Sequence, residues 1–508
     1  MTTPDAPHSP PLDEVERRRI GHLHPAGWRN PEPAARYHLV VIGAGPAGLA
    51  AAQAAAAAGA RVALLERAQI GGTSLNTGCV PSKALIRTAR LYADLRDAAR
   101  YGASAPGETA PPDFARAMER VRRLRARLAD DASAQRLAAA GVDLFFGEAR
   151  FAGTDCVRVG DTMLRFAKAL IATGARPNIP AIPGLAETGY LTHENVFDLT
   201  ALPPRLLVIG GGPLGCELAQ AFCRLGAKVT LVQDRPLFLP REERDAAQLL
   251  SDALARDGIA IRLNTRITAV QGRDGTRLVE MVSDNYRSSV EADAILTGIG
   301  HAANVEGLDL ERAEVDCSPA AGVLVDDFLR TGNPRIYAAG DVCMEHKYTH
   351  AAVAAARIAV RNALFRGHER LSRLAIPWCT FTDPEIAHVG LYVREANRRG
   401  IPVKTYTVPM HEIDRAVTDG EQEGFAKIHV QDRSDRILGA TVVARHAGEM
   451  INGITLAMES GLGLRGLERV IHAYPTQAEA IRAAADAYRV SRLTARVRAR
   501  LARWLDRA

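Results

Sequence analysis

Short runs of apolar residues alternate with Ala-rich or charged helical stretches along most of the chain. The run at residues 37–42 (YHLVVI) is typical of a buried parallel strand. A glycine-rich turn, an Ala-rich stretch and a second apolar run at residues 61–65 follow it. The same strand–turn–helix–strand order returns at residues 205–232. The pattern therefore predicts two βαβ units in an α/β fold.

The remaining periodicity predicts the other elements and the domain boundaries. A charged helical stretch covers roughly residues 114–140, a strand follows at 142–146, and an Ala-rich helix ends near residue 364. From residue 376 the texture changes to strands, such as 426–430 and 437–443, and then to helices, which predicts a separate α+β domain. We expect these divisions: a polar, Pro-rich arm at 1–36, in which residues 12–20 form a short helix; a first nucleotide domain at 37–194, resumed at 316–375; a second at 195–315; a C-terminal domain at 376–488; and a basic tail at 489–508.

The first glycine-rich turn predicts a pyrophosphate site. Gly43, Gly45 and Gly48 let the backbone turn tightly and approach the ligand, and the following helix N-terminus favours negative charge. Glu66 ends the next strand, 23 residues after Gly43, where a carboxylate can accept both ribose hydroxyls of an ADP moiety. These features together predict a three-layer dinucleotide-binding domain of the Rossmann type.

The second glycine-rich turn predicts a nicotinamide nucleotide site. It contains Gly210, Gly212 and Gly215, and the position equivalent to Glu66 is Gln233. A neutral side chain does not repel a ribose 2′-phosphate, and Arg235 can pair with one, so we expect NADPH in preference to NADH. Two such sites imply that hydride passes from a nicotinamide to a bound flavin.

The stretch GGTSLNTGCVPSK at residues 71–83 resembles the redox motif of the pyridine nucleotide-disulfide oxidoreductases. ATG at 172–174, YAAGDV at 337–342 and YPT at 474–476 extend the resemblance, which is nearest to the mercuric-reductase-like and dihydrolipoamide-dehydrogenase-like members. It implies bound FAD and a homodimer whose C-terminal domain sends the segment from Tyr474 to Glu479 into the partner's flavin site.

The resemblance also implies roles for individual residues. Cys79 matches the thiol packed against the flavin, and Lys83 and Glu217 match an ion pair beside its reactive nitrogen. Asp341 matches the ligand of the ribityl chain, and the helix opening at Thr349 and His350 points at the flavin ring. Further cofactor contacts are implied at Gly72, Thr73, Gly147, Ala149, Thr173, Gly174 and Gly300.

Two departures from the motif bear on the reaction. Ser74 stands where the family has the first redox cysteine, and a hydroxyl cannot form a disulfide, so dithiol–disulfide cycling in this motif is excluded. Tyr474 stands where disulfide-reducing relatives have the His paired with Glu479, while His472 lies two residues earlier; Tyr is a poor base near neutral pH. Mercuric reductases also lack that His but carry a C-terminal cysteine pair, whereas this chain has no cysteine beyond Cys379.

The other cysteines have no metal-ligand spacing, and no metal site is expected. Cys216 and Cys223 are expected in a helix core, and Cys343 is the best candidate for a surrogate thiol. A smaller departure is His301, where the family usually has an arginine.

Composition and charge narrow the function further. The last twenty residues hold seven arginines and one aspartate, which accounts for the whole formal charge of +6. The balanced body argues against nucleic-acid binding. Few cysteines, no signal-peptide pattern and no long apolar stretch lead us to expect a cytoplasmic protein.

The tail has two interpretations. Leu493, Val497, Leu501, Trp504 and Leu505 form an apolar stripe at helical spacing, flanked by arginines. Either the stripe packs on the body of the dimer and the arginines are solvated, or residues 489–508 contact anionic membranes or acidic partners peripherally.

Three functional hypotheses follow. The leading one is an FAD-dependent NAD(P)H:acceptor oxidoreductase whose small-molecule acceptor is not a disulfide, such as a quinone, a metal ion or oxygen. The second uses Cys79 alone, cycling through a sulfenic acid or a mixed disulfide, or reducing mercuric ion. The third is a catalytically degenerate flavoprotein that senses redox state or serves as a binding partner.

Overall fold

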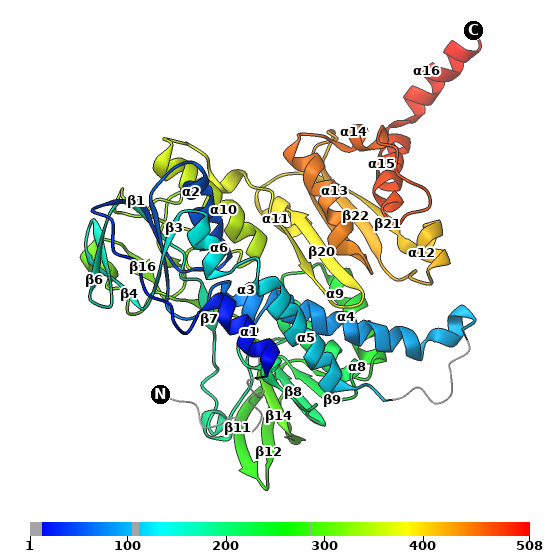
Figure 1. Cartoon of the computed structure of the whole chain (residues 1–508). Coiled ribbons are helices and arrows are strands. Elements are labelled where there is room, and N and C mark those ends of the chain that lie inside the picture. The colour runs from blue at the N-terminus through cyan, green and yellow to red at the C-terminus, as the bar shows by residue number, and fades with distance from the viewer. Residues whose placement is uncertain (1–12, 104–110, 285, 508) are drawn as a thin grey trace. The chain divides into compact units, whose positions relative to one another are not determined.

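The computed structural model describes residues 13–103, 111–284 and 286–507, which fall into two compact units (Figure 1). The first unit comprises residues 1–236 and 259–373, and the second comprises residues 237–258 and 374–508. The chain therefore enters the second unit at residue 237, returns to the first at residue 259, and enters the second again at residue 374.

The first nucleotide fold is built on a sheet with strand order β3-β2-β1-β6-β5-β4, and β18 pairs with the free side of β6. Strands β3, β2, β1, β6 and β18 run parallel, and their apolar runs are buried, as in the pairing of Val41 with Leu64 and Leu170. Helices α2 and α10 lie side by side near β1 (Figure 1). The strands are β1 Tyr37–Ile42, β2 Val62–Glu66, β3 Val142–Phe146, β4 Ala149–Gly153, β5 Cys156–Val159, β6 Thr162–Ile171 and β18 Ile336–Ala338. The helices are α1 Glu14–Leu23, α2 Pro46–Ala57, α3 Gly72–Asn76, α4 Cys79–Arg96, α5 Phe114–Ala129, α6 Ala134–Ala139 and α10 Thr349–Leu364.

The second nucleotide fold repeats the arrangement with a parallel sheet of order β10-β9-β8-β14. Helix α8 connects β8 to β9 and buries Leu218 and Phe222. An antiparallel sheet, β11-β12-β13, packs its inner residues with this core, among them Val279 and Met281. The bounds are β8 Arg205–Ile209, α8 Pro213–Arg224, β9 Lys228–Val232, β10 Ala260–Arg262, β11 Thr265–Arg273, β12 Thr276–Ser283, β13 Tyr286–Ala292 and β14 Ala294–Thr297. The connecting elements are β7 Ala175–Pro177, α7 Leu185–Thr188, β15 His301–Ala303, β16 Cys317–Ser318 and β17 Gly322–Val323.

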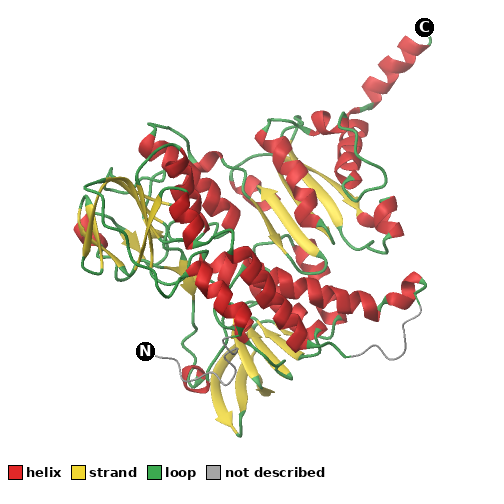
Figure 2. Cartoon of the chain, viewed as in Figure 1, coloured by secondary structure: helices red, strands yellow, loops and turns green. Residues whose placement is uncertain are grey.

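The second unit is an antiparallel sheet of order β19-β20-β23-β22-β21, with α13 across one face (Figure 2). Ile451 and Ile454 of α13 are buried against strand residues such as Val442. The bounds are β19 Pro377–Thr380, β20 Glu385–Gly390, β21 Val403–Pro409, β22 Phe425–Gln431, β23 Ile437–Ala444, α9 Arg244–Arg256, α11 Val393–Arg398, α12 Asp414–Thr418, α13 Ala447–Glu459, α14 Leu464–Glu468, α15 Glu479–Arg492 and α16 Ala495–Leu505.

This architecture confirms the expected fold class, with two parallel nucleotide folds and a C-terminal α+β part. Residues 237–258, which lie within the range predicted for the second nucleotide domain, group with the second unit. Glu242 accepts hydrogen bonds from Tyr392 Oη at 2.7 Å and Trp378 Nε1 at 3.1 Å, and Lys427 Nζ donates to Glu243 at 2.8 Å. The remaining predicted boundaries stay predictions.

Both ends of the described chain are helical. The arm helix is α1, at Glu14–Leu23, and Leu12 of the expected helix lies outside the described residues. The tail helix α16 extends beyond α15 (Figure 1), and Trp504 is 65% exposed, so its apolar stripe does not pack on the rest of the second unit. Within the described ranges, none of the helices combines the length and apolar character that crossing a membrane requires.

Candidate functional site

The first glycine turn is a backbone cradle that no larger residue fits. Gly43 has φ +104°, and a Cβ there would lie 2.4 Å from the carbonyl oxygen of Ala172. A Cβ at Gly48 would lie 1.8 Å from the carbonyl oxygen of Gly43. Helix α2 begins directly after Gly45, so its first N–H groups face this turn. The geometry fits the pyrophosphate of a dinucleotide.

Glu66 closes the first turn from the end of β2. Its carboxylate accepts the Ala44 N–H at 2.9 Å and the Ala68 N–H at 2.8 Å. Burial raises the pKa of Glu66, although these two N–H groups oppose the effect. Gly147 N donates to the Glu66 carbonyl at 2.9 Å, which brings the start of β4, at Ala149, beside the same edge of the sheet.

We call residues 71–83 the redox segment. Its Gly72 lies against the first glycine turn, because a Cβ at Gly72 would come within 2.7 Å of Gly45 Cα. Gly71 N donates to the Ala44 carbonyl at 2.8 Å. The redox segment thus starts at the predicted pyrophosphate cradle, with Thr73 exposed on its short helix.

Three side chains meet at the N-terminus of α10. Ser74 Oγ and Thr349 Oγ1 share a short hydrogen bond, and Cys79 Sγ lies 3.5 Å from the same Thr349 oxygen. Cys79 is the first residue of α4 and is exposed. A single hydroxyl therefore links the serine of the redox segment to its only thiol.

An ion pair joins the two nucleotide folds within the first unit. Lys83 Nζ, on α4, donates to Glu217 Oε2, on α8, at 2.8 Å. The Glu217 side chain is only 5% exposed, while that of Lys83 is 35% exposed. The pair expected from the resemblance is present; its place beside a flavin remains a prediction.

The second glycine turn has the same construction as the first. Gly210 has φ +109°, and a Cβ at Gly215 would lie 2.0 Å from the Gly210 carbonyl oxygen. Gly212 caps the N-terminus of α8. Gln233 Oε1 accepts the Gly211 N–H at 2.8 Å, as Glu66 accepts that of Ala44. Arg235 is exposed two residues later.

The links between the two folds contain three more of the predicted residues. Thr173 Oγ1 donates to the Asn304 carbonyl at 2.7 Å, and Asn304 Nδ2 donates to the Thr173 carbonyl at 3.0 Å. Gly174 and Gly300 have φ of +70° and +100°, where side chains are strained. The arrangement fixes the end of β6 against β15.

Asp341 and His350 flank the start of α10. Burial raises the pKa of Asp341, with the charge of Lys347 opposing it. His350 is exposed and stacks on Tyr348, with ring centroids 5.6 Å apart.

His301, which replaces the family's arginine, packs beside another histidine. The rings of His193 and His301 lie 5.0 Å apart. Burial and the neighbouring His301 lower the pKa of His193 to about 4, and burial with the charge of Lys347 lowers that of His301. Both rings are therefore neutral at physiological pH.

The remaining predicted catalytic residues belong to the second unit. Tyr474 Oη donates to Asp414 Oδ2 at 2.8 Å, which raises the pKa of Tyr474. Glu479, expected as the partner of position 474, instead accepts the Thr476 N–H at 3.4 Å and lies 3.6 Å from Arg482. His472 Nδ1 contacts the Val470 carbonyl at 3.1 Å. The proton-transfer roles of these residues remain predictions.

Among the other thiols, Cys317 is exposed, whereas the candidate surrogate Cys343 is not poised to react. Burial raises the pKa of Cys343 to about 12, so it stays protonated near neutral pH, which weakens its candidacy as surrogate thiol. Cys216 is buried in α8 and Cys223 is half-buried. Across the described part of the chain, no three His, Cys, Asp or Glu side chains gather as metal ligands would.

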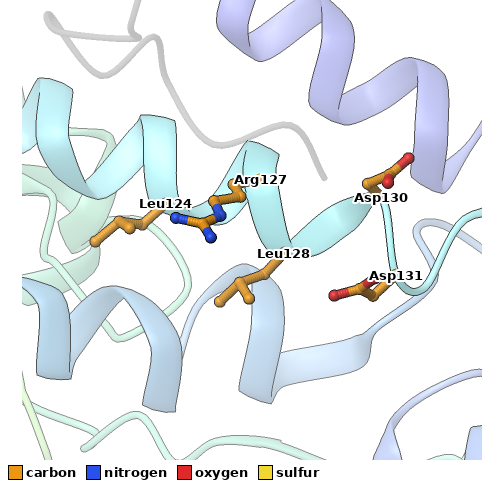
Figure 3. Close-up of a pocket in the computed structure, with 5 residues that line it drawn as sticks. All are labelled: Leu124, Arg127, Leu128, Asp130 and Asp131. Carbon is orange, nitrogen blue, oxygen red and sulfur yellow. The ribbon is translucent and has the colours of Figure 1, made fainter.

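A surface pocket on α5 contains none of the candidate residues described above. Its lining comprises Leu124, Arg127, Leu128, Asp130 and Asp131 (Figure 3). Arg136 already pairs with Asp130 and Asp131, each at 2.8 Å, and none of the predicted site residues lines the pocket.

Sequence reasoning missed three contacts of the candidate residues and the redox segment, two in the first unit and one in the second. The link from Ser74 to Thr349 spans 275 residues, that from Tyr474 to Asp414 spans 60, and that from Arg19 to Asn76 spans 57. No local spacing signal connects such positions. The Pro-rich composition of residues 1–36 gave no sign that Arg19 would be buried.

Comparison with known proteins agrees with this geometry. The family model of pyridine nucleotide-disulphide oxidoreductase matches residues 37–357, and that of the pyridine nucleotide-disulphide oxidoreductase dimerisation domain matches residues 376–485.

Individual relatives cover most of both chains. Mercuric reductase from Streptomyces lividans is 35% identical, with 89% of this chain and 96% of that protein aligned. Dihydrolipoyl dehydrogenase from Chlamydia muridarum is 33% identical over 87% of this chain and 95% of its own. A solved Cu(II) complex of a Cys-to-Ser mutant of RclA, an HOCl-induced flavoprotein disulfide reductase from Escherichia coli, has a TM-score of 0.79 and 30% identity, covering 88% of this chain and 98% of the other.

Proposed function

This chain belongs to the pyridine nucleotide-disulfide oxidoreductase family, and from that premise we propose that it reduces an acceptor that is not a disulfide. Members of the family are FAD-dependent NAD(P)H oxidoreductases, and this chain is an enzyme of that kind. Bound FAD supplies the two-electron chemistry that connects a nicotinamide to the acceptor.

The observation that carries the proposal is Ser74. Its hydroxyl lies in the redox segment, bonded to the same Thr349 oxygen that Cys79 contacts at 3.5 Å. A second thiol is required there to exchange with a substrate disulfide and close an internal one. Because Cys343 is held protonated by burial, it is not a ready replacement.

The chain's own residues support the binding of the two nucleotides. Gly43 and Gly48 admit a pyrophosphate at the start of α2, and Glu66 lies at the edge where a ribose would be held. Lys83 and Glu217 fix α4 against α8, which positions Cys79 and the second nucleotide turn in one rigid arrangement. Thr349 can donate a hydrogen bond to an anion at Cys79 Sγ.

A metal ion that binds thiols is the acceptor class best supported by the relatives. Proteins named mercuric reductase align along almost the whole chain, and the RclA Cys-to-Ser mutant binds Cu(II) according to its description. A single exposed cysteine beside the Thr349 hydroxyl suits transient contact with such an ion rather than tight chelation. Cu(II) and Hg(II) are therefore the first acceptors to test.

Three finer points belong to the same proposal. Gln233 accepts the Gly211 N–H without bringing a charge, so the second site is proposed to prefer NADPH over NADH. The dimerisation domain at residues 376–485 supports a homodimer. A cytoplasmic location stays part of the proposal.

The tail adds a proposed membrane contact. On α16, Val497, Leu501 and Trp504 are 39%, 45% and 65% exposed, and arginines flank them. An exposed basic amphipathic helix is attracted to anionic lipid headgroups, at about 1 kcal/mol for each basic residue near the surface. Sedimentation with anionic vesicles at low salt, comparing the full chain with one ending after Tyr488, tests it; equal binding would assign the tail to protein packing.

The main experiment follows NADPH oxidation by the FAD-loaded dimer. We expect rapid turnover with Cu(II) or Hg(II) and little with lipoamide or glutathione disulfide. Fast turnover of either disulfide by the unaltered protein would refute the proposal.

A second candidate function uses Cys79 alone, and the exposure of its thiol beside Thr349 favours it. Peroxide would oxidise the thiolate to a sulfenic acid, and a first small thiol would condense with it to a mixed disulfide and water. A second small thiol would then release Cys79 as a thiol and leave with the first as a disulfide. Thiol titration after one equivalent of peroxide distinguishes the two, because only this route consumes a thiol without metal.

A further inference from the structure

Residues 13–30 are named here the N-terminal clasp. They lie before the range that the family model matches, yet they make hydrogen bonds to the redox segment and to residues 68–70, which precede it. Helix α1 packs along α5, and its Arg19 is only 4% exposed although it carries a full charge. A charge is buried at this depth only when several partners compensate it.

Arg19 donates hydrogen bonds both within α1 and to the segment that contains Gly71 and Gly72. Nε donates to both carboxylate oxygens of Glu16 at 3.0 Å. Nη1 donates to Gln69 Oε1 at 2.8 Å and to Asn76 Oδ1 at 2.6 Å. One guanidinium therefore ties α1 to both ends of the turn that contains Gly71 and Gly72.

Asn76 passes this restraint to the backbone of the redox segment. Its Oδ1 is occupied by Arg19, which directs Nδ2 toward the carbonyl oxygens of Ile70 at 3.0 Å and Gly72 at 3.1 Å. Asn76 is the last residue of α3, two positions after Ser74 and three before Cys79. The amide orientation set by Arg19 thus fixes the short helix that carries Ser74.

The clasp makes further contacts to residues 68–70 and to the end of β3. Ile70 N donates to the Leu23 carbonyl at 3.3 Å, and His24 Nδ1 contacts the Ala68 carbonyl. Asn30 exchanges two hydrogen bonds with the backbone of Phe146, at 2.8 and 2.9 Å. The clasp is therefore held in two places, beside the redox segment through residues 19–24 and at the end of β3 through Asn30.

Charged groups on α5 and in the loop before β8 also surround Glu16 and Arg19. Burial raises the pKa of Glu16, but the hydrogen bond and charge of Arg19, with the charge of Arg125, outweigh it and hold that pKa below its usual value. Arg125 also lies 3.6 Å from Asp198, and Arg122 lies 3.8 Å from Asp13. Acids and bases alternate here, so Glu16 is ionised and keeps Arg19 in place.

We propose that Arg19 is a positioning residue that holds the redox segment in its working conformation through Asn76. The inference deepens the proposed function, since it assigns a support to Ser74 and Cys79, but it does not depend on which acceptor is reduced. Arg19 acts through Asn76 and is not a catalytic residue.

The chain offers a matched control, because Arg18 is exposed on the same helix and adjacent to Arg19. Amide hydrogen exchange is measured on the FAD-loaded protein for Arg19→Gln and Arg18→Gln, together with the rate of iodoacetamide reaction at Cys79. We expect exchange in residues 70–78 to rise at least fivefold and Cys79 alkylation at least threefold in Arg19→Gln, and neither to change in Arg18→Gln.

A conservative variant separates positioning from folding. Arg19→Lys keeps the charge opposite Glu16, but a single ammonium cannot reach Glu16, Gln69 and Asn76 as the planar guanidinium does. We expect an intermediate rise at residues 70–78 with exchange elsewhere unchanged. Unaltered exchange at 70–78 in both Arg19 variants, an equal rise in Arg18→Gln, or a uniform rise along the chain would overturn the proposal. None of these results depends on turnover, so they stand apart from the test of the acceptor.

Discussion

Ser74 and Thr349, 275 residues apart, share a hydrogen bond between their hydroxyls at the N-terminus of α10. Each hydroxyl has one proton to donate. When Thr349 donates to Cys79 Sγ, Ser74 must donate to Thr349, so the serine orients the hydroxyl that contacts the thiol. The serine thus influences the hydrogen bonding of Cys79 through Thr349, although it cannot form a disulfide as a cysteine would.

Removing the Thr349 hydroxyl should slow the chemistry of the thiol. We expect Thr349→Val to lower the rate of Cys79 alkylation at pH 7 by about tenfold, because a hydrogen bond to a charged group is worth roughly 1.5 kcal/mol. Thr349→Ser keeps the hydroxyl and should react within about twofold of the wild type. Equal rates for the valine and serine variants would show that the contact does not stabilise the thiolate.

Restoring a second thiol should restore disulfide chemistry. In Ser74→Cys we expect two thiols fewer by titration after mild oxidation, their recovery with dithiothreitol, and a long-wavelength absorption band after two-electron reduction of the FAD-loaded protein. Ser74→Ala is the control and should show none of these. A Ser74→Cys protein that retains both thiols after oxidation would contradict the assignment of position 74.

The nucleotide preference should follow the charge at position 233. Gln233→Glu keeps the hydrogen bond to Gly211 N–H but adds a carboxylate that repels a 2′-phosphate. We expect kcat/KM for NADPH to fall at least tenfold, about 1.4 kcal/mol, while that for NADH changes less. A wild-type preference for NADH by tenfold would refute the role given to Gln233.

The ion pair between Lys83 and Glu217 should be coupled energetically. Lys83→Met leaves a nearly buried carboxylate without this partner, and we expect the free energy of unfolding to fall by about 2 kcal/mol. A double-mutant cycle with Glu217→Gln should give a coupling of about 1–2 kcal/mol. The exposed pair of Arg136 and Asp131 serves as comparison and should give less than about 1 kcal/mol.

Mild acid should destabilise the first unit through His193. Its folded-state pKa of about 4 lies below the ordinary value of 6.5, so between these values the unfolded chain binds a proton that the folded chain does not. Stability therefore falls as the pH drops from 6.5 toward 4, by about 3 kcal/mol from this residue. His193→Gln should flatten the fall of Tm over this window, whereas the exposed His411→Gln should not; parallel curves for all three proteins would exclude the mechanism.

Local spacing was enough to predict the two nucleotide turns. In each, the residue at the end of the second strand accepts an N–H from the turn 22 residues earlier, Glu66 from Ala44 and Gln233 from Gly211. Such geometry follows from a strand, a turn and a helix of fixed length. The predicted strands at 142–146 and 437–443 correspond to β3 and β23, because a short, mostly apolar run is typical of a buried strand.

Contacts between distant segments were not predictable in this way. The partner of Tyr474 is Asp414 rather than Glu479, because the Glu479 carboxylate lies at the start of α15 and accepts the N–H of Thr476. Arg19 is a charged residue in a polar arm, and only the tertiary structure shows the acids and amides that bury it. Periodicity reports which face of an element is apolar, but it does not report which polar groups meet across the fold.

The excursion of residues 237–258 into the second unit bears on the order in which the protein is made. Glu242 leaves the ribosome 150 residues before Tyr392, its hydrogen-bond partner. Until Trp378 and Tyr392 emerge, the Glu242 carboxylate, buried in the finished unit, lacks both of these hydrogen-bond donors. Residues 237–258 therefore complete these contacts only after the last part of the chain has been made, which leaves the segment open to misassembly during much of synthesis.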